Sequence, residues 1–271
     1  MKHVLPALGL IIALTCAAAA RSPLRDIRYG PDPKQALDVY RPGTANGAPI
    51  IVMLHGGAWA IGDKSNKAVW QDKSRHWTAR GFLFVSVNTR LLPQATPAAQ
   101  AQDFARAVAH VQARATAWGG DPRNVIVMGH SAGAHIAALV GTDLDLQRTH
   151  NIAPLRGAVV LDTAALDLQG LMRNAPARLY RKAFGPDPRT WQDLSPLAQI
   201  DRNAPPVLAV CSTRRDNVCP AARAFADKAK TKSVPVSILP IDLSHRAVNA
   251  RLGQNSAYTR AVTDWIEKQL R

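Results

Sequence analysis

Short apolar runs alternate with longer amphipathic stretches along the chain from residue 49 onward. Runs rich in apolar and β-branched residues predict strands at 50–54, 82–87, 124–128, 157–161, 206–211 and 234–239. Apolar residues at helical spacing predict helices at 67–80, 96–118, 132–140, 221–230 and 257–270. Because strands and helices alternate, the pattern predicts an α/β fold in which helices cover both faces of a mostly parallel sheet.

Residues 163–200 interrupt this alternation. The segment is rich in Arg, Pro and Leu and contains no clear strand, so we expect an insertion that lies over the edge of the sheet as a small cap. No internal repeat is present, and a chain of 271 residues is long enough for one ordinary domain. The sequence therefore predicts a single domain over 21–271 with a cap-like insertion at 163–200.

The first twenty residues have the three-part pattern of a secretory signal peptide. A basic start leads into the apolar run 4–14, and four alanines at 17–20 end it just before Arg21. No second apolar run of membrane-spanning length follows, so we expect an exported protein, periplasmic or secreted, with no integral membrane segment after cleavage. A buried N-terminal helix is one alternative, and a lipid anchor at Cys16 is another.

The charge balance is strongly basic, with 34 Lys and Arg against 19 Asp and Glu, a formal net charge of +15. No run of five basic residues and no interleaved aromatic platform is present, so a nucleic-acid partner is not expected. A positive charge spread along the chain fits affinity for anionic envelope surfaces or acidic substrates better than nucleic-acid binding. A hydrophobic content of 47% is enough for a sizeable core and excludes a disordered chain. The sequence does not indicate an oligomeric state.

The most specific motif is Gly-His-Ser-Ala-Gly at 129–133, which lies between a predicted strand and a predicted helix. This is the G-x-S-x-G pattern that places a nucleophilic serine, here Ser131, on a tight turn. The two glycines have no Cβ to clash where the strand and the helix pass closely. The alternative is that Ser131 only caps the helix.

A second motif, His-Gly-Gly-Ala-Trp at 55–59, directly follows the predicted strand 50–54. Adjacent glycines allow backbone N–H groups to turn toward an oxyanion, so Gly56 and Gly57 are candidate donors together with the N–H of Ala132. A plain Gly-Gly turn is the alternative. Trp59 is a candidate substrate-binding residue, for which core packing is an equal alternative.

Together these motifs resemble the α/β-hydrolase fold, and in particular carboxylesterases with an HGG motif that are related to hormone-sensitive lipase and kynurenine formamidase. The resemblance covers most of residues 28–265 and includes the segments 37–42 and 243–245. Two positions depart from the family pattern: Ala58 replaces a third glycine, and Thr89 replaces a usual tyrosine. The resemblance therefore implies nothing about the acyl pocket of this chain.

The resemblance implies a catalytic triad in the chain order serine, acid, histidine. Of the three histidines after Ser131, only His245 lies in a loop after a late strand, where this fold places its base. Asp216 lies in the loop after the strand 206–211, where the family places its acid, and Asp242 is the reserve candidate. We therefore expect Ser131, His245 and Asp216 to form the triad.

Cys211 and Cys219 are the only cysteines that remain after signal cleavage. In an exported protein such a pair can form a disulfide, and this bond would close the loop that contains Asp216. Two reduced, unrelated thiols are the alternative. Chain-entropy reasoning assigns such a closure roughly 2–3 kcal/mol of stability.

These features predict a serine hydrolase that cleaves carboxylic esters through an acyl-enzyme, with a small-molecule ester as substrate. The sequence has no dinucleotide-binding, Walker A or zinc-protease motif, so no cofactor and no metal is expected. Hydrolysis of an N-formyl amide is one alternative function. A non-catalytic envelope-binding protein on the same fold is another.

Overall fold

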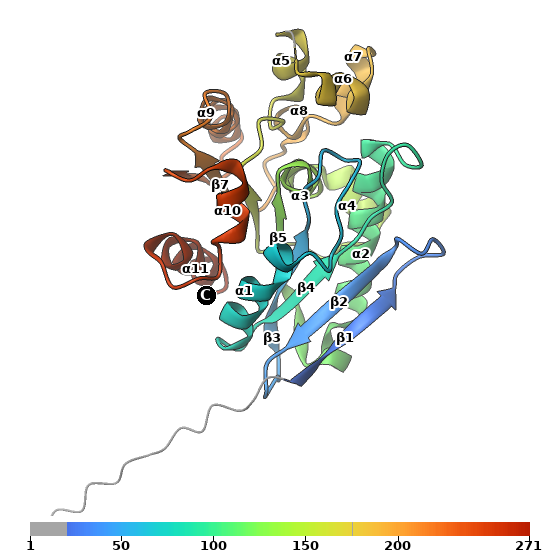
Figure 1. Ribbon diagram of the computed structural model, residues 1–271, viewed down its shortest axis with the longest axis vertical. Helices are drawn as coiled ribbons and strands as arrows, with labels where there is room; N and C mark the ends of the chain where they lie inside the picture. The colour runs from blue at the N-terminus through green and yellow to red at the C-terminus, as the bar shows by residue number, and fades with distance from the viewer. Residues whose placement is uncertain (1–20, 175) are drawn as a thin grey trace, which may run out of the picture.

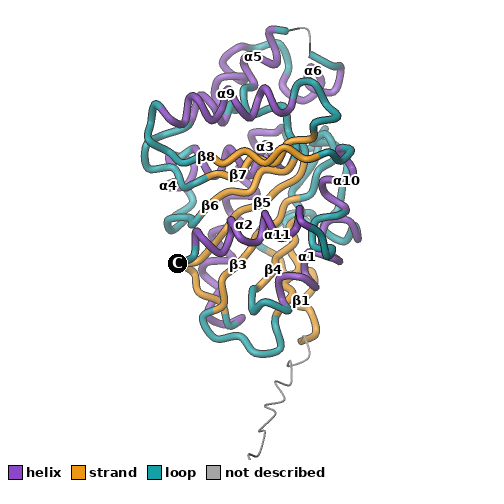
Figure 2. The backbone as a smooth tube through the Cα atoms, turned by 90° about the vertical axis from the view of Figure 1, so that its left-hand side faces the viewer, coloured by secondary structure: helices purple, strands orange, loops and turns teal. Residues whose placement is uncertain are grey.

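The computed structural model describes residues 21–174 and 176–271, drawn in Figure 1. The expected signal peptide at 1–20, including Cys16, lies outside the described residues. Eight strands form one sheet in the order β1-β2-β4-β3-β5-β6-β7-β8, and Figure 2 shows them from β8 at the top to β1 at the bottom. β2 is antiparallel to both of its neighbours, and all other pairs are parallel. The strands are β1 (Arg21–Arg28), β2 (Ala36–Arg41), β3 (Ala48–Leu54), β4 (Leu83–Val87), β5 (Gly120–His130), β6 (Gly157–Leu161), β7 (Val207–Ser212) and β8 (Val236–Ile241).

Helices cover both faces of the sheet. Along β3, Ile50 and Val52 face one helical layer, whereas Ile51 and Met53 face the other. The first layer contains α2, α3 and α9, and the second contains α1, α10 and α11. The helices are α1 (Lys67–Thr78), α2 (Pro97–Trp118), α3 (Ala132–Thr142), α4 (Leu144–Thr149), α5 (Leu168–Arg173), α6 (Arg178–Phe184), α7 (Pro188–Asp193), α8 (Pro196–Gln199), α9 (Val218–Lys230), α10 (His245–Ala250) and α11 (Ala257–Gln269). This arrangement is the α/β-hydrolase fold and confirms the predicted fold class.

The predicted strands and long helices are present with shifted ends, but outside the inserted segment the pattern missed β1, β2, α4 and α10. β1 and β2 form the antiparallel edge of the sheet, and α4 and α10 are short helices of six residues each. β1 contains three arginines and Pro23, and most of its side chains are exposed. Charges and proline are usual on an edge strand because they discourage pairing with other chains, and they also hide the strand from a search for apolar runs.

The segment between β6 and β7 folds into the four short helices α5 to α8. Its described residues contain no strand, in agreement with the sequence pattern. Figure 1 shows α5, α6 and α7 grouped at the top of the molecule. The segment is anchored to the rest of the fold through Phe184, whose ring packs against Trp59 with centroids 4.8 Å apart.

Six neighbouring strands, β4, β3 and β5 to β8, run parallel, so their carboxyl ends lie at one edge of the sheet. Ligand sites of open α/β sheets form at this edge. His55 follows β3 directly, Ser131 follows β5, and Asp162 follows β6. The fold therefore gathers side chains that are distant in the sequence. Within the described ranges, no helix is both long and apolar enough to cross a membrane.

Candidate active site

Ser131 occupies a strained turn between β5 and α3. Its backbone has φ 56° and ψ −117°, in the left-handed half of the Ramachandran plot that residues other than glycine rarely adopt. Although Ser131 precedes the first residue of α3, its side chain makes no capping hydrogen bond. The Oγ atom instead lies 2.9 Å from Nε2 of His245. The capping alternative is therefore not what this structure shows.

The glycines of the two motifs allow the backbone to approach the nucleophile closely. A Cβ on Gly133 would lie 2.3 Å from the carbonyl oxygen of His55, and one on Gly129 would lie 2.1 Å from that of Gly133. A Cβ on Gly56 would lie 3.0 Å from Cβ of Ser131. A side chain at Gly56 or Gly133 would push the turn after β3 away from the serine, and a side chain at Gly129 would push α3 away from β5. The packing reason predicted for Gly129 and Gly133 is confirmed.

His245 lies at the first position of α10, just beyond the loop in which it was expected. Its Nε2 faces Ser131, and its Nδ1 lies 2.5 Å from Oδ2 of Asp162. The carbonyl oxygen of His245 lies 2.9 Å from Nε2 of His130. Burial lowers the pKa of His130 to about 3, so His130 is uncharged, and its Nε2–H donates to this carbonyl. His130 thereby holds the backbone of the base.

The carboxylate beside His245 belongs to Asp162, so the expectation for Asp216 is wrong. Asp216 is exposed in the loop after β7 and has no hydrogen bond to His245 among the described contacts. The reserve candidate, Asp242, is also exposed and pairs with Arg214 at 2.7 Å. The physical reason is that several loops reach the same edge of the sheet, and β6 is closer to the β5 turn than β7 is.

Sequence reasoning missed Asp162, but a signal for it was present. Asp162 is the first residue after β6, just as Ser131 is the first after β5. It also satisfies the order serine, acid, histidine. Its backbone φ is 58°, and Ala58 and Trp59 also have positive φ. Such strain concentrates at functional sites because the surrounding structure must enforce it.

The surroundings of Asp162 keep its buried carboxylate ionised. Burial alone would raise the pKa of Asp162, but hydrogen bonds from His245, from the backbone N–H of Ser212 and from Arg215 hold it below its ordinary value. The Ser212 N–H is 2.7 Å from Oδ1, and the Arg215 guanidinium is 2.9 Å from Oδ2. A fixed anion at this position can orient His245 and stabilise its protonated form.

The candidate oxyanion donors surround the serine. Ala132 is the first residue of α3, so its N–H is among the helix donors that have no partner within the helix. Gly56 approaches Ser131 from the other side, and Gly57 has φ 130° in the following turn. His55 Nδ1 lies 2.8 Å from the carbonyl oxygen of Gly56. The backbone at 56–57 is thus held against the nucleophile, while its role as an oxyanion hole stays a proposal.

A cavity of about 600 Å³ lies beside Ser131. Its walls come from the turn after β3, from the ends of β5 and β6, from α6 and from α10. Trp59 lines it and is also buried against His135, Tyr180 and Phe184. The structure therefore gives Trp59 both a wall position and a packing role. Leu179 and Tyr180 extend the wall from the inserted segment.

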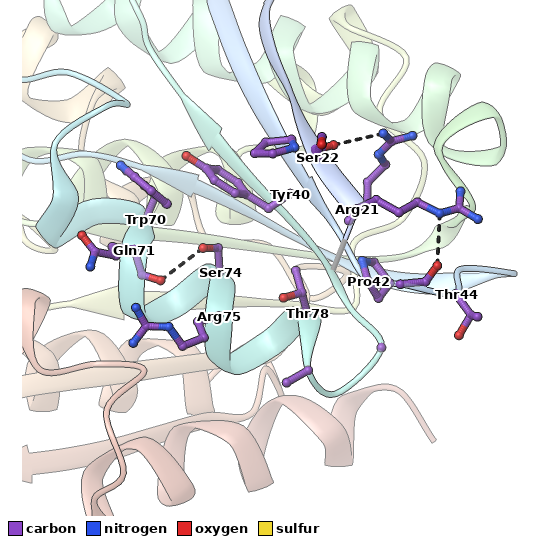
Figure 3. Close-up of a pocket in the computed structure, with 15 residues that line it drawn as sticks. Arg21, Ser22, Tyr40, Pro42, Thr44, Trp70, Gln71, Ser74, Arg75 and Thr78 are labelled. Atoms are coloured by element: carbon purple, nitrogen blue, oxygen red, sulfur yellow. Dashed lines mark hydrogen bonds between the residues drawn. The ribbon is translucent and has the colours of Figure 1, made fainter. Parts of the chain in front are cut away.

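A larger hollow of about 760 Å³ lies elsewhere on the molecule, between the β1–β2 edge and α1 (Figure 3). Tyr40 and Trp70 line it together with Arg21, Arg41 and Arg75. None of the described residues that line it is a histidine or a carboxylate. It lacks a nucleophile next to a base, so its greater volume does not make it the better candidate for hydrolysis.

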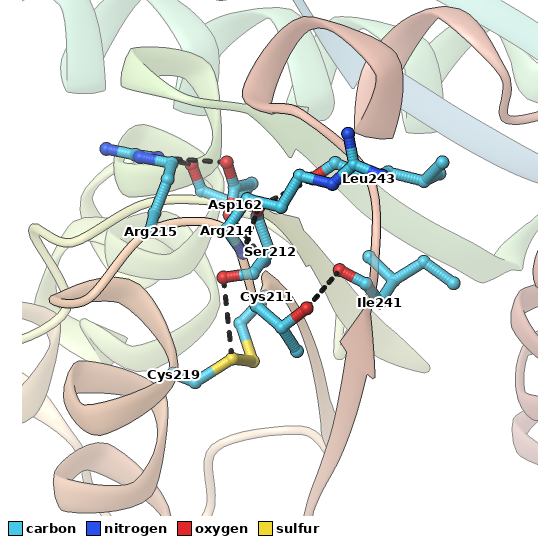
Figure 4. The surroundings of a disulfide bond; sticks show 9 residues. Asp162, Cys211, Ser212, Arg214, Arg215, Cys219, Ile241 and Leu243 are labelled. Atoms are coloured by element: carbon cyan, nitrogen blue, oxygen red, sulfur yellow. Dashed lines mark hydrogen bonds and ion pairs between the residues drawn. A yellow bond between two sulfur atoms is a disulfide. The ribbon is translucent and has the colours of Figure 1, made fainter.

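The structure contains a disulfide between Cys211 and Cys219 (Figure 4). The bond closes the loop after β7, which contains Asp216, as expected from the sequence. The loop acts on the site through other residues, however, because Ser212 and Arg215 are the ones that contact Asp162. The Oγ of Ser212 also donates to the carbonyl oxygen of Leu243, two residues before His245. The disulfide therefore constrains a loop that touches both the acid and the segment of the base.

Removing this disulfide is expected to weaken both stability and activity. The double variant Cys211→Ala and Cys219→Ala should lose about 2–3 kcal/mol of unfolding free energy, measured by urea denaturation. Its kcat toward an ester should fall because Ser212 and Arg215 are less constrained. A thiol reductant should have the same effect on the parent and none on the variant. A parent protein that is insensitive to reduction would contradict this role.

A protein-family model described as BD-FAE matches residues 37–229 of the chain. The matched region contains Ser131, Asp162 and the glycines of both motifs. The chain belongs to the BD-FAE family. The match ends before His245, so the position of the base in this BD-FAE protein comes from the structure.

Curated relatives of this BD-FAE protein include esterases. Esterase LipQ of Mycobacterium tuberculosis is 30% identical over 260 residues, covering 89% of this chain and 61% of the relative. Esterase LipC of the same organism is 29% identical over 227 residues, covering 77% of this chain and 55% of the relative. The chain thus spans little more than half the length of these relatives.

Solved structures share the fold of this BD-FAE protein. A truncated carbohydrate esterase from gut microbiota superposes with a TM-score of 0.78 at 19% identity, covering 93% of this chain and 97% of the other. Esterase 2 of Thermogutta terrifontis superposes with a TM-score of 0.71 at 22% identity, covering 93% and 91%. At these identities the likeness supports the α/β-hydrolase fold alone.

Proposed function

We propose that the chain is a serine hydrolase that cleaves carboxylic esters of small molecules through an acyl-enzyme. The observation that carries the proposal is the continuous contact from the Oγ of Ser131 through His245 to the buried carboxylate of Asp162. Esterases among the relatives support the same reaction class. Because the chain spans only part of those relatives, its own activity has to be measured.

In the proposed mechanism, Nε2 of His245 takes the proton of Ser131 while Oγ attacks the acyl carbon. Nδ1–H of His245 donates to Asp162, which stabilises the imidazolium that forms. The backbone N–H groups of Ala132 and Gly57, with Gly56 as a further donor, stabilise the oxyanion, each contributing on the order of 3 kcal/mol. His245 then protonates the leaving alcohol and activates the water that releases the acid.

The substrate would bind in the cavity beside Ser131, with Trp59 as one wall and α6 of the inserted segment as another. We propose that residues 163–200 act as a cap over this cavity. We also propose export of the mature protein, since a disulfide is compatible with an oxidising compartment. The basic surface would suit an anionic envelope environment.

Hydrolysis of p-nitrophenyl esters from acetate to long acyl chains, run beside N-formylkynurenine, tests this function. We expect turnover of the esters, with a chain-length preference set by the cavity, and weaker turnover of the formamide. Preference for the formamide would favour the amidase alternative. A folded protein that turns over neither substrate and never reacts with a fluorophosphonate probe would favour a non-catalytic binding protein.

A further inference from the structure

The loop after β7 holds the acid from two sides (Figure 4). The backbone N–H of Ser212 donates to Oδ1 of Asp162 at 2.7 Å. The guanidinium of Arg215 donates from Nη1 to Oδ2 at 2.9 Å and to the main-chain oxygen of Asp162 at 3.2 Å. Both carboxylate oxygens are therefore occupied, and Arg215 fixes the side chain and the backbone of the acid with one group.

Arg215 also lies directly beside the base. Oδ2 of Asp162 is shared between Arg215 and His245, and Nη1 of Arg215 is 3.0 Å from Nδ1 of His245. Nδ1 must carry a proton to donate to the carboxylate, so it cannot accept one from the guanidinium. Arg215 and His245 therefore do not bond to each other, and both donate to Oδ2 of Asp162.

The other ionisable groups around His245 do not take the place of Arg215 on the carboxylate, whose described side-chain partners are Arg215 and His245. His130, at the end of β5, has its ring centroid 4.6 Å from that of His245 but is uncharged because burial lowers its pKa. Burial raises the pKa of Tyr180 on α6, so this hydroxyl is uncharged too. Asp63 also lines the cavity, where it accepts hydrogen bonds from Ser65 and Asn88, and Arg246 is exposed on α10 itself.

We propose that Arg215 is a positioning residue for hydrolysis, which aims the carboxylate of Asp162 at Nδ1 of His245. This role rests on the proposed function. It assigns to the loop after β7 the task of holding the acid, while the acid itself comes from the loop after β6. It also explains why that loop is closed by a disulfide.

The split between kcat and KM for p-nitrophenyl acetate tests this role. Arg215→Gln should lower the plateau kcat roughly tenfold with little change in KM, since the acid is less well aimed. Arg215→Lys keeps the charge but loses the planar fork that holds the carboxylate, so its kcat should recover only in part.

Arg214→Gln is the matched control, because Arg214 is the neighbouring arginine of the same loop and pairs only with exposed Asp242 and its backbone among the described side-chain contacts. It should leave kcat and KM unchanged. An unchanged kcat and KM in Arg215→Gln would overturn the proposal, and a rise in KM at constant kcat would overturn it in favour of substrate binding. If circular dichroism shows that Arg215→Gln is unfolded, the kcat of Arg215→Lys is the test. A plateau kcat of Arg215→Lys equal to the parent's would overturn the proposal.

The failure of this role differs from the failure of the proposed function. An inactive parent would contradict the proposed function, whereas an active parent with insensitive Arg215 variants would contradict only this role.

Discussion

Replacing Asp162 by Asn is expected to lower kcat for ester hydrolysis by about four orders of magnitude while KM changes little. Asparagine has nearly the same shape, but it lacks the negative charge that stabilises the imidazolium. It can also present its NH₂ group to His245, which favours the tautomer that cannot accept the Ser131 proton. Steady-state kinetics at the plateau of the pH profile measures the effect, and circular dichroism checks that the variant folds.

Asp216→Asn and Asp242→Asn are the controls for this prediction. Both carboxylates are exposed, and neither contacts His245 among the described interactions. Their variants should retain kcat within about twofold of the parent, since surface substitutions rarely change a rigid site. A loss of several orders of magnitude in Asp216→Asn, with an active Asp162→Asn, would return the acid to the loop after β7.

Ser131→Ala is expected to abolish ester hydrolysis, with kcat falling by roughly 10⁴-fold to 10⁶-fold. The variant loses the nucleophile but keeps the cavity and the backbone donors, so substrate should still bind. Alanine and serine are strained to about the same degree at φ 56°, and the glycines that allow the turn are unchanged in the variant. The global fold and the urea midpoint should therefore stay close to the parent's.

The same variant should no longer react with a fluorophosphonate probe, whereas the parent should gain the mass of one probe molecule per chain. Peptide mapping should place the added mass on Ser131. A parent that is labelled at another serine, or a Ser131→Ala variant that keeps its turnover, would exclude Ser131 as the nucleophile.

The central part of the fold was predictable from the sequence because its strands are buried on both faces. Continuous runs of apolar and β-branched residues, such as 50–54 and 125–128, are typical of parallel strands that are buried on both faces. The serine was predictable for a related reason. Its turn needs glycines at fixed offsets on both sides of Ser131, and this local requirement leaves a readable motif.

The acid was not predictable with the same certainty because it has no local requirement of this kind. Asp162 and Asp216 follow adjacent parallel strands whose ends lie at the same edge of the sheet. Only the positions of side chains decide between them. Asp162 is the first residue after β6 and is buried. Asp216 lies further beyond the end of β7, in an exposed part of the loop.

Proton NMR of the Nδ1–H of His245 reports on the contact between His245 and its acid. A short hydrogen bond to a buried carboxylate shifts this proton far downfield of the amide region. We predict such a resonance in the parent and in Asp216→Asn, and its loss in Asp162→Asn. A resonance that survives in Asp162→Asn and disappears in Asp216→Asn would show that His245 is paired with Asp216 and not with Asp162.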